Sequence, residues 1–188
     1  MHSRSASTLA TIMAAFAMSA WSFAAGAQTS AKPGPATPDP QATTATYGDW
    51  ILRCQKTGEG AQVVKACEIA QSLQLQGQPN PIAQIAIGRT SPKDPFKLFV
   101  VVPNNVAFPS SPQLSIDEKD DAPAVLAWRR CVAGGCIAET QVKDDVLKRW
   151  RGQSERGRLQ FKDAADRDVV LPFSFRGFAD ALDALTKS

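Results

Sequence analysis

Two cysteines that enclose a pair of glycines constrain the fold of this chain more than any other feature of its sequence. Cys131 and Cys136 flank residues 132–135, which end in Gly134 and Gly135, and an apolar segment lies on each side. Paired glycines are typical of tight turns, because glycine adopts backbone conformations that other residues rarely enter. The segment therefore predicts a β-hairpin that is closed by its own disulfide.

The first 27 residues have the organisation of a secretory signal peptide. A short basic opening, Met1–Arg4, precedes an uncharged apolar run at Leu9–Ala20, and residues 25–27 form a small-x-small cleavage site. The apolar run has about 12 residues, whereas a membrane-spanning helix needs roughly 20. We expect cleavage after Ala27 and export to the periplasm, and the mature protein could then attach to the outer membrane or be secreted. We expect no transmembrane segment in the mature chain.

The four cysteines, Cys54, Cys67, Cys131 and Cys136, are an even number in a chain predicted to be exported, so disulfides are expected. Local turn chemistry favours Cys54–Cys67 and Cys131–Cys136, with loop-closure gains of about 3 and about 2 kcal/mol. Loop entropy alone leaves the crossed pairings open. The spacing lacks both the paired short knuckles of a structural zinc site and the C-x-x-C motif of a redox centre.

The mature chain is expected to consist of one linker and one domain. Residues 28–46 are rich in Pro, Ala and Thr and have little to bury, which predicts a disordered linker. Residues 47–188 then suffice for a single β-sandwich-like domain with one core. Short β-forming runs recur at spacings near ten residues, around residues 50–54, 66–75, 82–87, 96–102, 113–117, 124–130, 137–142, 159–162 and 169–175.

These runs predict an all-β fold, either an antiparallel β-sandwich or an open barrel, with one or two short helices. One helix is expected at residues 144–150, with Asp144 or Asp145 as its N-cap. The other is a C-terminal helix at residues 177–185, where an apolar stripe recurs at helical spacing. Phe173, Phe175 and Phe178 are expected in the core.

Charge and histidine content limit the possible functions. Removal of residues 1–27 leaves 20 of the 21 basic residues against 18 acidic ones, and a net charge of +2 does not indicate a nucleic-acid partner. The single histidine, His2, lies in the signal peptide. The mature chain therefore has no Ser/His/Asp or Cys/His nucleophile and no histidine-containing metal site, and we predict no catalytic residue, metal or cofactor.

Two charged segments are candidate surfaces. Residues 143–158 include Lys148, Arg149, Arg151 and Arg156, which predict contact with anionic lipid, lipopolysaccharide or an acidic partner. Interleaved acids leave open the alternative of an ordinary solvated helix. The acidic residues 117–121 lack the spaced oxygen ligands and glycine of a calcium-binding loop, so we expect a solvated surface turn.

Several segments in order resemble the invasion-associated locus B family of exported proteobacterial envelope proteins. The resemblance covers about residues 47–186 and rests on Gly48-Asp49-Trp50 ahead of Cys54, Cys67-Glu68-Ile69, Cys131 with Gly135-Cys136, and Phe175-Arg176-Gly177-Phe178-Ala179-Asp180-Ala181-Leu182. It implies a β-rich, sandwich-like domain in the periplasm or outer envelope. The founding members are linked to host-cell invasion, and the family has no established catalytic residues.

Three functions follow as hypotheses. The first is a non-enzymatic, disulfide-stabilised envelope protein that binds an unknown envelope or host protein or a surface component, with a role in invasion or envelope fitness. The second is a carboxylate-dependent hydrolase of envelope glycans, which needs two acids facing each other across a cleft. The third is a structural or stress-protective envelope component.

Overall fold

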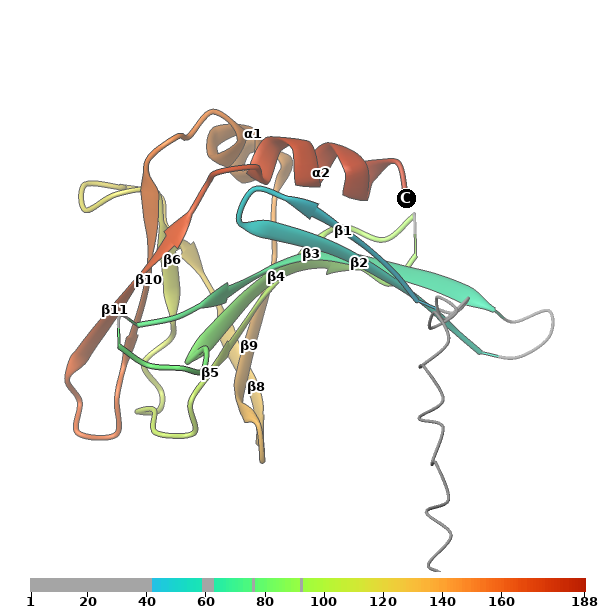
Figure 1. The fold of residues 1–188 in the computed structure, drawn as a ribbon. Coiled ribbons are helices and arrows are strands. Elements are labelled where there is room, and N and C mark those ends of the chain that lie inside the picture. Colours follow the sequence, from blue (N-terminus) through green and yellow to red (C-terminus); the bar gives the residue numbers. More distant parts are fainter. Residues whose placement is uncertain (1–41, 59–62, 76, 92) are drawn as a thin grey trace, which may run out of the picture. The chain divides into compact units, whose positions relative to one another are not determined.

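The computed structural model describes residues 42–58, 63–75, 77–91 and 93–188, which form eleven strands and two helices (Figure 1). The predicted signal peptide and residues 28–41 of the predicted linker lie outside the described residues. Every paired strand in the described chain is antiparallel. The prediction of an all-β, sandwich-like fold with one or two short helices, including a C-terminal helix, is confirmed.

The strands form two sheets. The larger sheet has seven strands in the order β1 (Ala42–Tyr47), β2 (Trp50–Thr57), β3 (Val64–Leu73), β4 (Ala83–Arg89), β5 (Lys97–Val102), β9 (Gly135–Gln141) and β8 (Ala127–Val132). The smaller sheet has four, in the order β11 (Asp168–Ser174), β10 (Arg156–Lys162), β6 (Gln113–Ser115) and β7 (Ala124–Val125). The helices are α1 (Asp144–Arg151) and α2 (Phe178–Thr186), and α2 packs over β1, β2 and β3.

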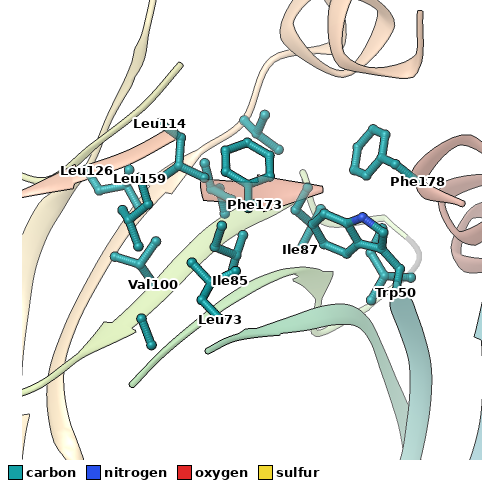
Figure 2. Close-up of a cluster of buried hydrophobic side chains, with 14 of the residues drawn as sticks. Trp50, Leu73, Ile85, Ile87, Val100, Leu114, Leu126, Leu159, Phe173 and Phe178 are labelled. Carbon is teal, nitrogen blue, oxygen red and sulfur yellow. The ribbon is translucent and has the colours of Figure 1, made fainter. Parts of the chain in front are cut away.

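The core lies between the smaller sheet and the face of the larger sheet that is turned toward it, which we call the inner face (Figure 2). Side chains alternate along a strand, so every second residue of β4 and β5 points inward. Ile85, Ile87, Leu98 and Val100 are fully buried there. The predicted core aromatics are confirmed, because Phe173, Phe175 and Phe178 are buried in the same cluster.

Strand β1 corrects the predicted boundary of the linker. Residues 42–46 pair in register with β2, where Ala42 lies opposite Gln55 and Tyr47 opposite Trp50. Their threonines are β-branched and favour strands, and a partner strand follows immediately after a tight turn. The composition of residues 28–46, averaged over the prolines that precede Ala42, concealed this local preference.

The two disulfides are cross-strand links within the larger sheet. Cys54 in β2 lies directly opposite Cys67 in β3, with 4.1 Å between their Cα atoms. Cys131 in β8 lies opposite Cys136 in β9, with 3.9 Å between their Cα atoms. These are the two pairs that turn chemistry favoured. Val132 and Gly135 also pair, so the loop of this hairpin consists of residues 133 and 134 alone.

Two details at the helix α1 end of the molecule differ from the sequence expectations. The N-cap of α1 is Lys143, with no side-chain cap hydrogen bond, and Asp144 and Asp145 instead lie in the first turn, where their charges favour the helix dipole. The acidic turn is only partly solvated, because Asp120 accepts hydrogen bonds from the backbone N–H groups of Ile116 and Ala122. Its side chain is 1% exposed.

Arg149 explains why this carboxylate is tolerated in a buried position. One guanidinium nitrogen lies 2.7 Å from Asp120 Oδ1, and another donates to the carbonyl of Ala122 at 2.6 Å. Burial opposes ionisation of Asp120, but the two backbone hydrogen bonds and the charge of Arg149 together hold its pKa below the ordinary 3.8. Asp120 is therefore buried because of Arg149, which lies 29 residues away in the sequence.

Candidate functional site: a groove on the outer face of the larger sheet

The face of the larger sheet opposite the core, which we call the outer face, is hollowed by two adjoining pockets. One has a volume of about 750 Å³ and lies over β2, β3, β4, β5 and the turn before β5. The other has a volume of about 530 Å³ and extends across β5 and β9 to β8. Both are lined by Glu68 and Phe99, so we treat them as one outer-face groove.

Strand register explains why charged groups collect along this groove. Arg53, Glu68, Gly88 and Lys97 lie opposite one another in successive strands from β2 to β5. Ala70, Ala86, Phe99 and Glu139 form the next such row. Gly88 leaves room in the groove and allows β3 and β4 to pack closely, since an added Cβ would approach the carbonyl oxygen of Cys67 within 2.8 Å.

The charges in the groove form two ion-paired groups. Arg53 Nε lies 2.5 Å from Glu68 Oε1, and its Nη2 donates to Gln84 at 3.0 Å. Glu139 pairs with Lys97 at 3.4 Å and with Arg129 at 3.0 Å. Ala86, Val101 and Ile137 add apolar surface to the lining. The groove therefore offers both charged and apolar contact to a ligand.

A β-bulge at the end of the groove adds a second arginine. The register of β8 against β9 shifts between Trp128 and Arg130, so that Arg129 is an extra residue. Consecutive strand residues normally point to opposite faces, but a bulge re-aims one of them. Arg129 and Arg130 consequently both line the groove. Within the described chain no acid pairs with Arg130, whereas Arg129 is bound to Glu139.

The basic residues predicted to contact an anionic surface do not line this groove. Arg149 is held by Asp120, and Arg151 pairs with Asp183 of α2. Lys148 and Arg156 are exposed. Contact of these residues with lipid or lipopolysaccharide stays a prediction, and two of the four charges already have acidic partners.

Sequence reasoning did not identify the groove residues. The available signals were the alternation of charged with apolar residues in β2 and β3 and the Arg129-Arg130 pair before Cys131. Alternation alone predicts a half-exposed strand and does not indicate which strands share a face. Among the described residues, no cluster of His, Cys, Asp or Glu could hold a metal ion, and no helix there has the length and apolarity to cross a membrane.

A second cluster joins the two ends of the described chain, and we call it the terminal junction. It consists of Gly48, Asp49, Trp50, Arg176, Gly177 and Phe178. The backbone N–H of Asp49 donates to the carbonyl of Arg176 at 3.0 Å, and the Arg176 guanidinium hydrogen-bonds both carboxylate oxygens of Asp49. Hydrogen bonds from Arg176 and then Ser174 hold the pKa of Asp49 below its ordinary value.

Close packing explains the two glycines of the terminal junction. Gly48 has φ +56°, and a Cβ there would approach the carbonyl oxygen of Arg176 within 2.5 Å. Gly177 has φ +82°, and a Cβ there would collide with the carbonyl of Tyr47. Trp50 completes the cluster, with its ring 5.1 Å from that of Phe178 and its indole N–H donating to Ser174 at 2.8 Å. The terminal junction is therefore structural.

A family model described as "Invasion associated locus B (IalB) protein" matches residues 50–186. The chain belongs to the IalB family. Most of the terminal junction lies inside the matched range, and Trp50 at the start of that range contacts Phe178 near its end. The IalB resemblance inferred from short motifs is thus confirmed.

A solved structure agrees with this assignment. The crystal structure of invasion associated protein B from Bartonella henselae has a TM-score of 0.63 and 21% sequence identity, covering 77% of this chain and 96% of that chain. At this identity the likeness establishes a shared fold. A comparison with curated proteins finds no match.

Proposed function

We propose that this IalB protein is exported by cleavage after Ala27 and acts in the bacterial envelope, without catalysis, by binding a partner protein or surface component in the outer-face groove. The groove itself is the observation that carries the proposal. It combines about 750 and about 530 Å³ of adjoining volume with arginines and an aromatic floor residue, Phe99. Arginine and aromatic side chains are the types enriched in protein-binding surfaces.

The cross-strand disulfides support a binding role in an oxidising compartment. Cys67 lines the groove at one end, and the Cys131–Cys136 link holds β8 against β9 at the other. A surface that is already rigid loses less conformational entropy when a partner binds. Disulfides persist in the periplasm and outside the cell, which agrees with the predicted signal peptide.

A glycan hydrolase is the second candidate, because Glu68 and Glu139 line the same pocket. Hydrolysis needs one carboxyl group that stays protonated to act as a general acid. Both acids instead serve as ion-pair partners of arginine. The pairing supports binding better than catalysis. Release of reducing sugars from peptidoglycan or lipopolysaccharide that disappears in Glu68→Gln and Glu139→Gln variants would favour the hydrolase.

The groove can be tested by photo-crosslinking in living cells. A photoreactive amino acid replaces Phe99 in the groove, and the control replaces Val170, an exposed residue of β11 in the smaller sheet. We expect a discrete crosslinked product in the periplasmic fraction from position 99 and none from position 170. Absence of a product from position 99 would contradict the proposal.

Export is tested in the same cells by mass spectrometry of the mature protein. The proposal expects an N-terminus at Gln28 and recovery in the periplasmic or outer-membrane fraction. A deletion strain distinguishes the structural or stress-protective alternative, which expects loss of membrane integrity without a crosslinked partner. The Bartonella neighbour is called invasion associated, and a host-cell invasion assay of the same deletion strain tests whether that role extends to this chain.

A further inference from the structure

We infer that the free edge of β8 binds an extended segment of a partner protein in which acidic side chains alternate with apolar ones. This inference rests on the proposed function and specifies its partner. The chain from Ala124 to Val132 provides the last strand of both sheets, as β7 in the smaller and β8 in the larger. A sheet edge presents unpaired N–H and C=O groups that a further strand can extend.

The position of the disulfide shows which backbone groups of β8 are available. Directly opposite residues in an antiparallel pair lie close together when they do not hydrogen-bond to each other. The 3.9 Å between the Cα atoms of Cys131 and Cys136 identifies such a pair. The N–H and C=O of Cys131 therefore point away from β9, toward the free edge. Five of the six residues of β8 are exposed.

One face of an added strand would meet positive charge. The bulge directs both Arg129 and Arg130 to the outer face, and Arg130 has no acidic partner among the described residues. Alternate side chains of a strand added beside β8 would lie over this face. Carboxylates at those positions would meet the two guanidinium groups, and arginine is well suited to bind carboxylates because its donors form a planar fork.

The other face of an added strand would meet apolar surface. Trp128 lies opposite Ala138 and points to the inner face, where its ring is 5.3 Å from that of Phe108. Phe108 is 59% exposed, which is unusual for a large apolar side chain beside a sheet edge, and Val125 in β7 is 50% exposed. The remaining alternate side chains of the partner are therefore expected to be apolar.

The same features disfavour a second copy of this chain as the occupant. Two β8 strands paired edge to edge would bring their Arg129-Arg130 pairs close together, and like charges across strands are destabilising. An acidic strand reverses the sign of that interaction. Charge complementarity thus selects an acidic partner.

The inference is tested with two peptides of the same composition, both N-acetylated and C-amidated. One alternates, Glu-Val-Glu-Phe-Glu-Val-Glu, and the other is blocked, Glu-Glu-Glu-Glu-Val-Val-Phe. Each is titrated into the ¹⁵N-labelled mature protein while amide shifts are recorded. We expect saturable shifts in β8, including Cys131, and affinity for the blocked peptide to be about tenfold lower. An alternating peptide that is N-methylated at every residue should not bind, because neither of its edges then has an N–H group to donate to β8.

Charge-reversal variants locate the contact. Arg130→Glu should weaken binding of the alternating peptide by about tenfold or more, since a carboxylate would face a carboxylate. Lys187→Glu makes the same charge change at the end of α2, which packs over β1, β2 and β3, and should leave binding unchanged. Vesicles that contain anionic phospholipid are tested in parallel with both variants.

Several outcomes would overturn the inference. These are no saturable binding of the alternating peptide, equal binding of the blocked or N-methylated peptide, and Arg130-dependent binding to the vesicles but not to the peptide. The last outcome would assign the edge to a membrane surface. None of them decides the proposed function, which depends on the crosslink from position 99. If a partner is crosslinked at position 99 but the peptide does not bind at β8, the proposed groove stands and the inferred strand addition fails.

Discussion

The two faces of the seven-stranded sheet are built from alternate residues of the same strands, but one packs against the core and the other carries the groove. On β5 the inward residues Leu98, Val100 and Val102 are buried against the core, whereas Lys97, Phe99 and Val101 face outward. The inner face is apolar and covered, and the outer face is charged, hollowed and open. A strand repeats every two residues, so one segment can specify stability and binding separately. Substitutions at neighbouring positions should consequently have different effects.

The largest expected difference compares Leu98 with its neighbour Lys97. Leu98→Ala removes a fully buried side chain and should lower the free energy of unfolding by about 2–5 kcal/mol. Lys97→Ala changes an exposed groove residue and should alter the free energy of unfolding by about 0.5 kcal/mol or less. Urea denaturation followed by tryptophan fluorescence measures both. Similar losses in the two variants would contradict the separation of the faces.

The next prediction compares the two disulfides. Replacement of Cys54 and Cys67 by serine should lower the free energy of unfolding by about 3 kcal/mol, and replacement of Cys131 and Cys136 by about 2 kcal/mol, since the longer loop restricts the unfolded chain more. Only the second pair flanks the β8 edge, so only its removal should weaken binding of the alternating peptide. Denaturant titration and peptide titration of each double variant give the two readouts. A greater stability loss from the hairpin pair would reverse the expected order.

A third prediction concerns a charge that stabilises the fold. The pKa of Asp120 in the folded protein lies below its ordinary 3.8. The contribution of this carboxylate to stability is therefore present at neutral pH and is lost as the pH falls from about 4 through the folded pKa. Asp120→Asn should lower stability at pH 7 by about 1–3 kcal/mol and make it less dependent on pH in the acidic range.

The matched control for Asp120 is Asp121→Asn, at an exposed neighbour. Thermal unfolding of the wild-type protein and both variants, measured between about pH 2 and 7, shows how steeply the stability of each depends on pH. If Asp120→Asn keeps the pH dependence of the wild-type protein, the assigned ion pair with Arg149 does not stabilise the fold.

The smallest expected effect on stability is that of Glu139→Gln in the groove. Its partners Lys97 and Arg129 are 50% and 58% exposed, and ion pairs with such solvent-accessible groups contribute less than about 1 kcal/mol. Arg129 would lose its internal acid, so affinity for the acidic alternating peptide should rise. Calorimetric titration measures that change. A large loss of stability, or weaker peptide binding, would show that Glu139 holds the groove together.

The strand pattern and the hairpin were largely predictable because they depend on local preferences. The β-forming run at residues 96–102 is an interior strand of the larger sheet, and the apolar stripe after Gly177 forms α2. Residues 42–46 were assigned to the linker because their strand depends on pairing with β2. Asp120 was expected to be solvated because its arginine partner is distant in the sequence. The groove was missed because its residues come from six strands, and local patterns do not give the order of strands in a sheet.

The sequence by itself determined the class of fold, the hairpin at Cys131–Cys136 and the family, because turn residues, strand period and short motifs are local properties of the chain. Only the tertiary structure decided that Gly48-Asp49-Trp50 contacts Arg176-Gly177-Phe178, and that Glu68, Phe99 and Arg130 share one groove. Both depend on antiparallel register and sheet order, which arise when distant segments bury their apolar faces against each other.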